Sequence, residues 1–273
     1  MAVVCATLLA AGILATGAVS GASARVAASP KDTRIMLVGG SVAETLGWGL
    51  SVEAPRWHVE FEDYALIGCG VTRATPMDYG GVPFPTEPYC QTWPQIYAHD
   101  VAKFHPQVAV LLAGRWEVAD AYWRGHWTDI YNSGYAAYIA SQLALAIHVL
   151  SAGGAKVALL TAPYYAAKTE PFEPIGVKSC SPGCNRHFSE DDPGRVVRFN
   201  QILAKVAASF PGVATVVPFG AHADPGGHFA ARIGSVQVRN PDGVHFTVPA
   251  GGEWAAPWLY PRLLALAPNG ARR

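Results

Sequence analysis

A serine near the amino terminus stands where a nucleophile could lie. Ser41 follows Gly39 and Gly40 at the end of the apolar run IMLVG, residues 35–39, and a helical pattern begins directly after it. In an open parallel sheet, ligands bind beyond the carboxyl ends of the strands, which is where Ser41 would lie. The alternative role is an N-cap of the following helix, which is common for serine. Taken alone, Ser41 favours the cap.

A base for this serine stands near the carboxyl terminus, in the segment RNPDGVHFTVPAGG, residues 239–252. Asp242 precedes His245 by three residues, a spacing at which a carboxylate in a turn can bond the imidazole Nδ1–H and stabilise the imidazolium. An isolated D-x-x-H motif is also compatible with an incidental surface turn. Its place before the last predicted helix, in a chain whose first strand ends in a serine, favours a triad of Ser41, His245 and Asp242.

The elements that would position these residues alternate between strand and helix. Strand-like runs cover residues 35–39, 58–64, 107–113, 155–161 and 213–218, and helical patterns cover residues 42–50, 92–103, 131–152, 194–209 and 250–266. Continuous apolar strands are typical of a parallel sheet with helices on both faces. We predict one α/β domain with three layers, α/β/α, around a central parallel sheet of about five strands.

Two long irregular stretches interrupt this order, residues 68–91 and residues 162–193. Loops of this length in a compact domain are usually lids or rims of a binding site.

Composition and charge exclude several classes of protein. Of the 273 residues, 51% are hydrophobic and 15% are charged, which indicates a well-buried core and excludes a disordered chain. Twenty basic and 20 acidic residues give a formal net charge of zero, so no basic field is available for nucleic acid.

The amino-terminal stretch resembles an export signal. Residues 2–19 are uncharged, and Ala22 and Ala24 precede Arg25 like an A-x-A cleavage site, although the usual basic residues at the start are absent. The run is also long enough to be a membrane anchor. We therefore predict a signal peptide or anchor over residues 1–24 and a single domain over residues 25–273. We expect that domain to be secreted, periplasmic or held at the cell envelope facing outward.

Cysteine usage agrees with export. Apart from Cys5 in the leader, the chain has four cysteines: Cys69, Cys90, Cys180 and Cys184. An even number in an exported chain favours disulfides, with three connectivities open. We expect the local pairs Cys69–Cys90 and Cys180–Cys184.

No metal or cofactor is expected. The segment HADPGGH, with His222, Asp224 and His228, matches no metal motif, so a solvated loop is the favoured interpretation. Six aromatic residues follow predicted strand ends and could stack on sugar rings or pack in the core: Trp116, Tyr122, Trp123, Trp127, Tyr164 and Tyr165.

Together these segments resemble the SGNH, or GDSL-type, hydrolase family. Its first motif, G-D-S-x, is similar to residues 39–42, and its last motif, D-x-x-H, is similar to residues 242–245. The resemblance extends over residues 34–267 and implies a flavodoxin-like fold. It implies that Ser41 is the nucleophile, His245 the general base and Asp242 the residue that orients it. It also implies an oxyanion hole made by the N–H groups of Ser41 and Gly70, with Gly68 as the less favoured glycine.

The resemblance narrows to one group. The segments CxTWPxxY at 90–97, LLAGRWEVAD at 111–120 and RVVRFNQIL at 195–203 are similar to SGNH domains attached to membrane acyltransferases that O-acylate cell-surface polysaccharides. This implies a carbohydrate or another acylated small molecule as substrate and a membrane acyltransferase as partner.

Two positions depart from the family pattern. Gly40 replaces the aspartate of G-D-S, and the third motif, G-x-N-D, reads Gly114-Arg115-Trp116-Glu117. The resemblance makes Arg115, Trp116 and Glu117 substrate-binding residues, with Trp116 where the asparagine donor of the oxyanion hole would be. Losing such a donor costs about 3 kcal/mol. The indole N–H of Trp116 or the guanidinium of Arg115 could replace it, or Trp116 could only pack.

Two functions follow. The first is an exported serine esterase or O-acyltransferase acting on acyl esters, with acetyl expected, of carbohydrate or cell-envelope glycan through an acyl-enzyme. The alternative is a catalytically weak or inactive SGNH-like domain that binds glycan or serves as an accessory.

Overall fold

Five parallel strands form the centre of the computed structural model, which describes residues 32–168 and 186–268. Their order in the sheet is β2-β1-β5-β8-β9. Each strand overlaps one that the sequence predicts, and the strands are β1 (Thr33–Gly39), β2 (Val59–Asp63), β5 (Val108–Leu112), β8 (Lys156–Leu160) and β9 (Ala214–Val217). The middle strands β1, β5 and β8 are almost wholly buried, which explains their continuous apolar sequences.

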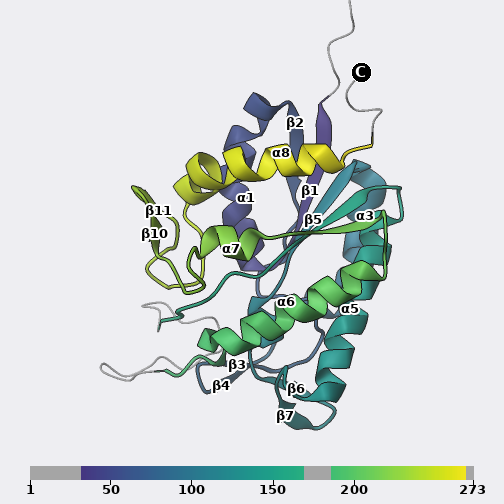
Figure 1. Ribbon diagram of the computed structural model, residues 1–273. Coiled ribbons are helices and arrows are strands. Elements are labelled where there is room, and N and C mark those ends of the chain that lie inside the picture. Colours follow the sequence, from purple (N-terminus) through teal and green to yellow (C-terminus); the bar gives the residue numbers. More distant parts are fainter. Residues whose placement is uncertain (1–31, 169–185, 269–273) are drawn as a thin grey trace, which may run out of the picture.

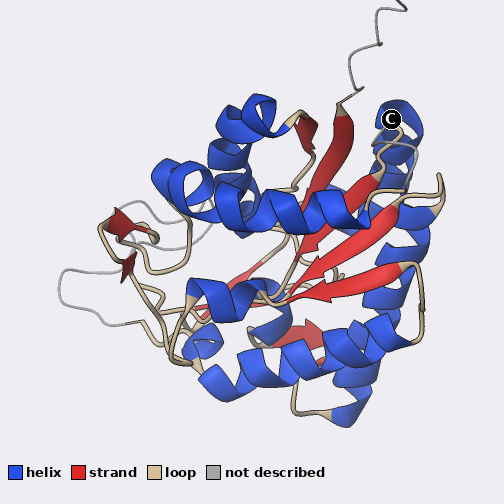
Figure 2. Ribbon diagram, turned by 45° about the horizontal axis from the view of Figure 1, so that its top comes forward, coloured by secondary structure: helices blue, strands red, loops and turns tan. Residues whose placement is uncertain are grey.

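Helices cover both faces of this sheet (Figure 1, Figure 2). One face carries α1 (Ser41–Glu53), continued by η1 (Ala54–Trp57), and α8 (Ala256–Leu266), preceded by the π-helical turn η3 (Ala250–Ala255). The other face carries α3 (Trp93–Phe104), α5 (Ser133–Ser151) and α6 (Pro193–Ala208). The predicted three-layer α/β/α architecture is therefore confirmed.

Local sequence explains where the two long helices begin. The side chain of Asn132 accepts hydrogen bonds from two N–H groups of the first turn of α5, and Asp192 does the same for one N–H of α6, where Pro193 follows at the first helical position. By length and composition α5 is the one helix of the described chain that could span a membrane. Of its most apolar window, 44% is buried inside the protein.

A second sheet occupies parts of the chain for which the sequence predicts no strands. It is antiparallel, in the order β4-β3-β6-β7, with strands of three residues: β3 (Met77–Tyr79), β4 (Val82–Phe84), β6 (Ala121–Trp123) and β7 (His126–Thr128). Residues 80–81 and 124–125 close its two hairpins, and all four have positive φ, as in type I′ turns. The prediction of an irregular loop over residues 68–91 is therefore wrong for 77–84.

The remaining elements are short. They are α2 (Pro88–Gln91), α4 (Arg115–Val118), α7 (Phe219–Ala223), η2 (Ser189–Asp191) and the hairpin of β10 (Arg232–Ile233) and β11 (Val236–Gln237). A disulfide joins Cys69, in the loop after β2, to Cys90 in α2, with the two Cα atoms 5.2 Å apart. This confirms one predicted pair, and Cys180 and Cys184 lie outside the described residues.

The strand order determines where a ligand can bind. From β1 the chain moves outward to β2 and then crosses to β5, on the other side of β1. The carboxyl ends of β1 and β5 therefore form the topological switch point of the sheet, the usual place for a ligand in open α/β folds. Ser41 follows β1 and Gly114 follows β5 at this point.

Candidate active site

The turn between β1 and α1 presents the hydroxyl group of Ser41. Gly40 is the N-cap of α1 and has no side chain to cap it, while Ser41 is the first helical residue. The Oγ of Ser41 lies 2.8 Å from Nε2 of His245. Gly39 has a φ of 148°, and a Cβ there would lie 2.1 Å from the carbonyl oxygen of Leu112 on β5. Only glycine fits at Gly39, and Ser41 is not the N-cap of the alternative interpretation.

The turn after β11 brings His245 and Asp242 to this serine. The Nδ1 of His245 lies 2.7 Å from Oδ2 of Asp242. The other carboxylate oxygen, Oδ1, accepts hydrogen bonds from the backbone N–H groups of Val244 at 2.7 Å and His245 at 2.9 Å. Burial by itself would raise the pKa of Asp242, but the hydrogen bonds from His245 and Val244 outweigh burial and lower the pKa to about 2. Asp242 is therefore a carboxylate over the whole neutral range.

Two backbone N–H groups near Ser41 are free to bind an oxyanion. Neither the N–H of Ser41 nor the N–H of Gly70 donates to another described residue. A Cβ on Gly70 would lie 2.2 Å from Oε1 of Glu117 and 3.0 Å from Cβ of Trp116, so a larger residue would push this loop away from α4. Gly68, the less favoured glycine, has open space around it.

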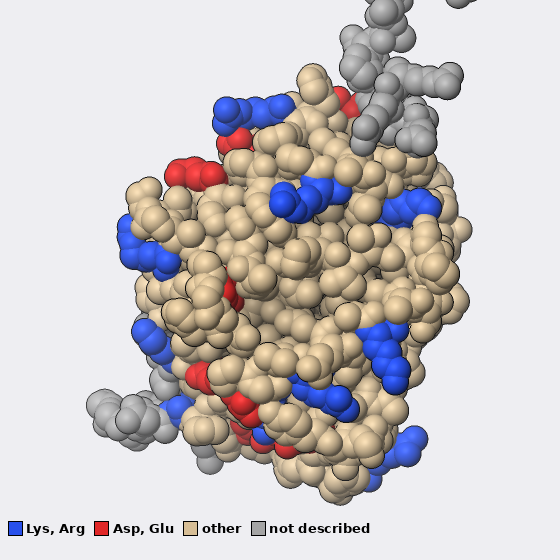
Figure 3. All heavy atoms as spheres, viewed as in Figure 1, with Lys and Arg blue, Asp and Glu red and all other residues tan. Residues whose placement is uncertain are grey.

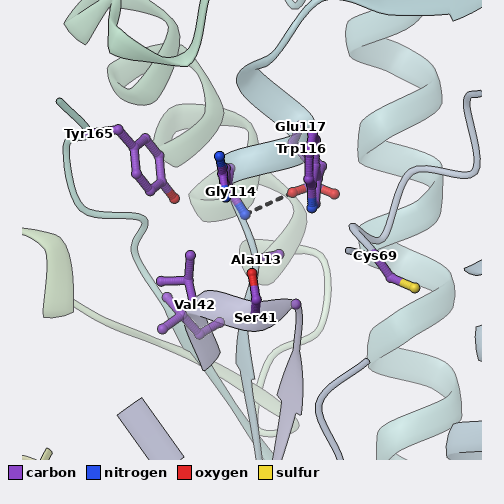
Figure 4. Close-up of a pocket in the computed structure, with 11 residues that line it drawn as sticks. Ser41, Val42, Cys69, Ala113, Gly114, Trp116, Glu117 and Tyr165 are labelled. Atoms are coloured by element: carbon purple, nitrogen blue, oxygen red, sulfur yellow. Dashed lines mark hydrogen bonds between the residues drawn. The ribbon is translucent and has the colours of Figure 1, made fainter. Parts of the chain in front are cut away.

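Glu117 binds backbone rather than solvent. It is fully buried. Its Oε1 accepts hydrogen bonds from the N–H groups of Val71 at 2.6 Å and Thr72 at 3.2 Å, and its Oε2 accepts one from Gly114 at 2.7 Å (Figure 4). Burial raises the pKa of Glu117 against these hydrogen bonds. The sequence predicts substrate contact for Glu117, whereas the structure shows it fastening the loop of Gly70 to the end of β5.

Trp116 lines both cavities that Ser41 lines. It is only 5% exposed, and its Nε1 is buried without a hydrogen-bond partner in the described chain. Its ring stacks on Phe84 of β4 with 5.6 Å between ring centroids. Figure 4 shows Trp116 and Ser41 around the same small cavity. A buried indole N–H normally has an acceptor, so a donor role toward a bound substrate is left open for this group.

Arg115 is held by neighbours. Its Nε donates to Oε1 of Glu190 at 3.3 Å, and its guanidinium carbon lies 5.0 Å from the ring centroid of Trp116. The residue is 9% exposed and lines the groove beside Ser41. Arg115 thus reaches the site predicted for it, with part of its guanidinium committed to a buried ion pair.

The departure at Gly40 has a structural reason. A Cβ on Gly40 would lie 2.5 Å from the carbonyl oxygen of Cys69. The loop that the Cys69–Cys90 disulfide anchors therefore occupies the space into which the family's aspartate would extend. In this chain glycine at position 40 is a requirement of packing.

Two cavities meet at Ser41. The smaller has a volume of about 10 Å³, enough for one water-sized group, and lies between Ser41, Val42, Gly114, Trp116 and Tyr165. The larger is a groove of about 360 Å³, lined by residues that include Ile67, Tyr79, Phe84, Trp116, Lys168 and His245. Phe84 and Lys168 are groove residues that the sequence did not identify.

On the face shown in Figure 3, charged side chains of both signs are scattered among uncharged ones.

The histidine-rich segment considered for metal binding is used in packing. The ring of His222 lies between those of Trp254 and Trp258, with centroids at 4.4 Å and 4.1 Å. Asp224 pairs with the buried Arg239 at 3.4 Å. These two residues are therefore engaged elsewhere.

The family of the chain follows from a comparison with protein families. The model of the SGNH domain fused to AT3 domains matches residues 14–221, more than half of the chain. The match ends before Asp242 and His245, so the fold alone shows that their turn meets Ser41. No curated protein sequence matches the chain.

Several solved structures resemble this one. TesA is 16% identical over 86% of this chain and 99% of its own, with a TM-score of 0.48. The periplasmic domain of a lipopolysaccharide acetyltransferase from Salmonella ser. Paratyphi A is 12% identical over 81% and 80%, with a TM-score of 0.46. A salicylyl-acyltransferase from a tetracycline biosynthetic pathway is 12% identical over 87% and 55%, with a TM-score of 0.45.

The assignment to a family rests on the family model rather than on these distant structures. Its match includes the β1–α1 turn of Ser41 and the segment of residues 114–117. The chain belongs to the SGNH domain family, whose model is described as fused to AT3 domains, and is by this membership an enzyme of ester hydrolysis or acyl transfer.

Proposed function

We propose that the chain is an exported serine esterase or O-acyltransferase that acts on acetyl esters of carbohydrate or cell-envelope glycan. One observation carries this proposal. The hydrogen bonds from Ser41 to His245 at 2.8 Å and from His245 to Asp242 at 2.7 Å form a continuous line that ends at the switch point of the sheet. This is the geometry that activates a serine hydroxyl.

The reaction proceeds in two steps. As the Oγ of Ser41 attacks the ester carbonyl carbon, its proton passes to Nε2 of His245, and Asp242 stabilises the imidazolium. The tetrahedral intermediate collapses, the bond to the alcohol oxygen breaks, and His245 returns the proton to that oxygen. Water or a sugar hydroxyl then gives its proton to His245 and attacks the acyl carbon. The bond between that carbon and Oγ of Ser41 breaks, and His245 returns the proton to Oγ, which releases the acyl group and restores Ser41.

The negative charge of the intermediate needs donors. The free N–H groups of Ser41 and Gly70 supply two, and the unpartnered Nε1–H of Trp116 supplies the one that the family takes from asparagine. The N-terminus of α1, where Ser41 lies, adds the positive end of a helix dipole. Preorganised donors of this kind are usually the largest single contribution to catalysis.

The two cavities support a small acyl group and a large alcohol. A volume of about 10 Å³ beside Ser41 suits a methyl group or an oxyanion rather than a long chain. The groove of about 360 Å³ has room for a sugar ring, and the aromatic residues Phe84 and Tyr79 line it together with Lys168. Apolar rings with a few polar groups are the usual lining of a ligand site.

Export and a membrane partner complete the proposal. We infer that residues 1–24 act as a signal peptide or anchor and that residues 25–273 form the one domain. The Cys69–Cys90 disulfide supports an oxidising compartment. The family model describes domains fused to AT3 domains, which supports a membrane acyltransferase as the donor of the acyl group.

The test is hydrolysis of p-nitrophenyl acetate, p-nitrophenyl butyrate and glucose pentaacetate by the purified chain. Acetyl esters should be cleaved faster than butyryl esters, and Ser41→Ala should abolish cleavage. Ser51→Ala is the matched control, because Ser51 is an exposed serine of the same helix. Binding of oligosaccharides without cleavage of any ester would instead support the accessory glycan-binding role.

A further inference from the structure

A buried tyrosine without a hydrogen-bond partner lines the small cavity beside Ser41. Tyr165 is 4% exposed, and its hydroxyl group bonds to no described residue. Figure 4 shows the ring reaching from the segment after β8 with its hydroxyl end toward Gly114. Its hydroxyl oxygen keeps some accessible surface at this cavity, so it can bond an acceptor that enters there.

The backbone around Tyr165 is fixed. On one side, the side chain of Asn200 accepts from the N–H of Ala162 at 2.8 Å and donates to its carbonyl at 3.0 Å. On the other side, the N–H of Ala166 donates to the carbonyl of Gly243 at 3.1 Å, in the turn between Asp242 and His245. Tyr165 therefore keeps a constant position relative to the proposed triad.

Glycine at position 114 leaves room for the hydroxyl group. A Cβ on Gly114 would lie 2.4 Å from Cβ of Ala162 and 3.1 Å from Oη of Tyr165. Tyr165 and Trp116, whose buried Nε1 also lacks a partner, both line a cavity that holds about one atom next to Ser41. Two unpartnered donors at one cavity indicate a shared acceptor that arrives with the substrate.

We propose that Tyr165 is a further catalytic residue, whose hydroxyl group donates a hydrogen bond to the oxyanion formed at Ser41, together with Trp116. The proposal rests on the proposed function above. Burial raises the pKa of Tyr165, so the hydroxyl keeps its proton at neutral pH and can donate a hydrogen bond. The two side chains would then replace the asparagine that the family motif has and this chain lacks.

The experiment compares Tyr165→Phe with Tyr164→Phe. Tyr164 is the neighbouring half-buried tyrosine and lines a different cavity. With p-nitrophenyl acetate, Tyr165→Phe should lower kcat by roughly 10- to 100-fold and change KM little. Tyr164→Phe should behave like the wild type.

A second readout separates donation from packing. Methylboronic acid adds to a serine hydroxyl as a tetrahedral anion, so its affinity should fall in parallel with kcat in Tyr165→Phe, whereas the affinity for acetate should not. Unchanged kcat, or an equal loss of affinity for both ligands with a lowered Tm, would overturn the role of Tyr165.

The wild type decides which proposal has failed. If the wild type neither cleaves the ester nor reacts with a serine-directed phosphonate, the proposed function and the role of Tyr165 are both overturned. If the wild type reacts and Tyr165→Phe reacts at the same rate, only the role of Tyr165 is overturned.

Discussion

Restoring the aspartate of the family motif should damage this protein. The backbone of Gly40 has φ −93° and ψ −162°, which any residue can adopt, so the obstacle is space. A Cβ would lie 2.5 Å from the carbonyl oxygen of Cys69, closer than side-chain carbons approach. The loop cannot retreat freely, because the disulfide to Cys90 and the hydrogen bonds of Glu117 hold it on either side of Gly70.

The magnitude follows from this clash. Overpacking a well-packed site costs about 1–3 kcal/mol, which for a chain of this size lowers Tm by roughly 2–12 °C. Any retreat of the loop also moves the N–H of Gly70, and a misplacement of about 1 Å can cost on the order of 100-fold in rate. Gly40→Asp should therefore lower both Tm and kcat/KM for p-nitrophenyl acetate, and Gly40→Ala should show the part that is due to Cβ alone.

The matched control is Gly153→Ala, after α5, where a Cβ would meet only Cγ1 of Val101 at 3.6 Å. This variant should keep wild-type activity and stability. Equal or higher activity of Gly40→Asp, with an unchanged Tm, would show that the loop of Cys69 does not occupy the place of the missing carboxylate.

Three further predictions concern the surroundings of the site. Trp116→Phe keeps the bulk and removes the N–H, so kcat/KM for p-nitrophenyl acetate should fall by a factor that corresponds to a loss of about 1.4–4 kcal/mol of transition-state stabilisation. The control Trp127→Phe, on the surface, should have no effect. Equal values of kcat/KM for Trp116→Phe and the wild type would show that Trp116 has only a structural role. Cys90→Ser removes the disulfide that holds the loop of Gly70, the proposed oxyanion donor. The free energy of unfolding, measured in urea, should fall by roughly 3 kcal/mol, and kcat should fall more than KM changes. A wild-type kcat would refute the positioning role of the disulfide. Burial raises the pKa of Asp63 to about 7 from 3.8. The folded state then holds a proton that the unfolded state lacks between those values, so stability falls as pH rises. Between pH 5 and pH 8 the free energy of unfolding should drop by roughly 2–3 kcal/mol more in the wild type than in Asp63→Asn. The exposed control Glu60→Gln should follow the wild type. Parallel curves of this free energy against pH for the wild type and Asp63→Asn would contradict the raised pKa of Asp63.

Local patterns predicted the parts of the fold that are continuous in sequence. The three middle strands β1, β5 and β8 are apolar runs buried on both faces, so hydrophobicity alone marks them, whereas the edge strands β2 and β9 are only partly buried. Ser41 and His245 could be identified because each belongs to a short motif next to a predicted element boundary. The turn of His245 lies about 200 residues from Ser41, and only the parallel topology implies that both reach one edge of the sheet.

The features that were missed depend on tertiary contacts. Strands of three residues, such as β3 and β4, have too little pattern to be recognised, although Gly80-Gly81 between Tyr79 and Val82 is a hairpin signal. The role of Glu117 could not be predicted, because two of its hydrogen-bond partners, Val71 and Thr72, lie 46 and 45 residues away. The same holds for Tyr165, which lines the cavity beside Ser41 only after β8 has been placed beside β5.

The central claim is that Ser41 carries the acyl group during the reaction. The measurement is rapid-quench mass spectrometry of the chain mixed with p-nitrophenyl acetate, followed by peptide mapping, for the wild type, Ser41→Ala and His245→Ala. The account predicts one acetyl group on Ser41 of the wild type, formed at the rate of the p-nitrophenol burst, and none at this rate in either variant. A wild type that hydrolyses the ester without acetylation of Ser41, or a Ser41→Ala variant that hydrolyses it at the wild-type rate, would contradict the account.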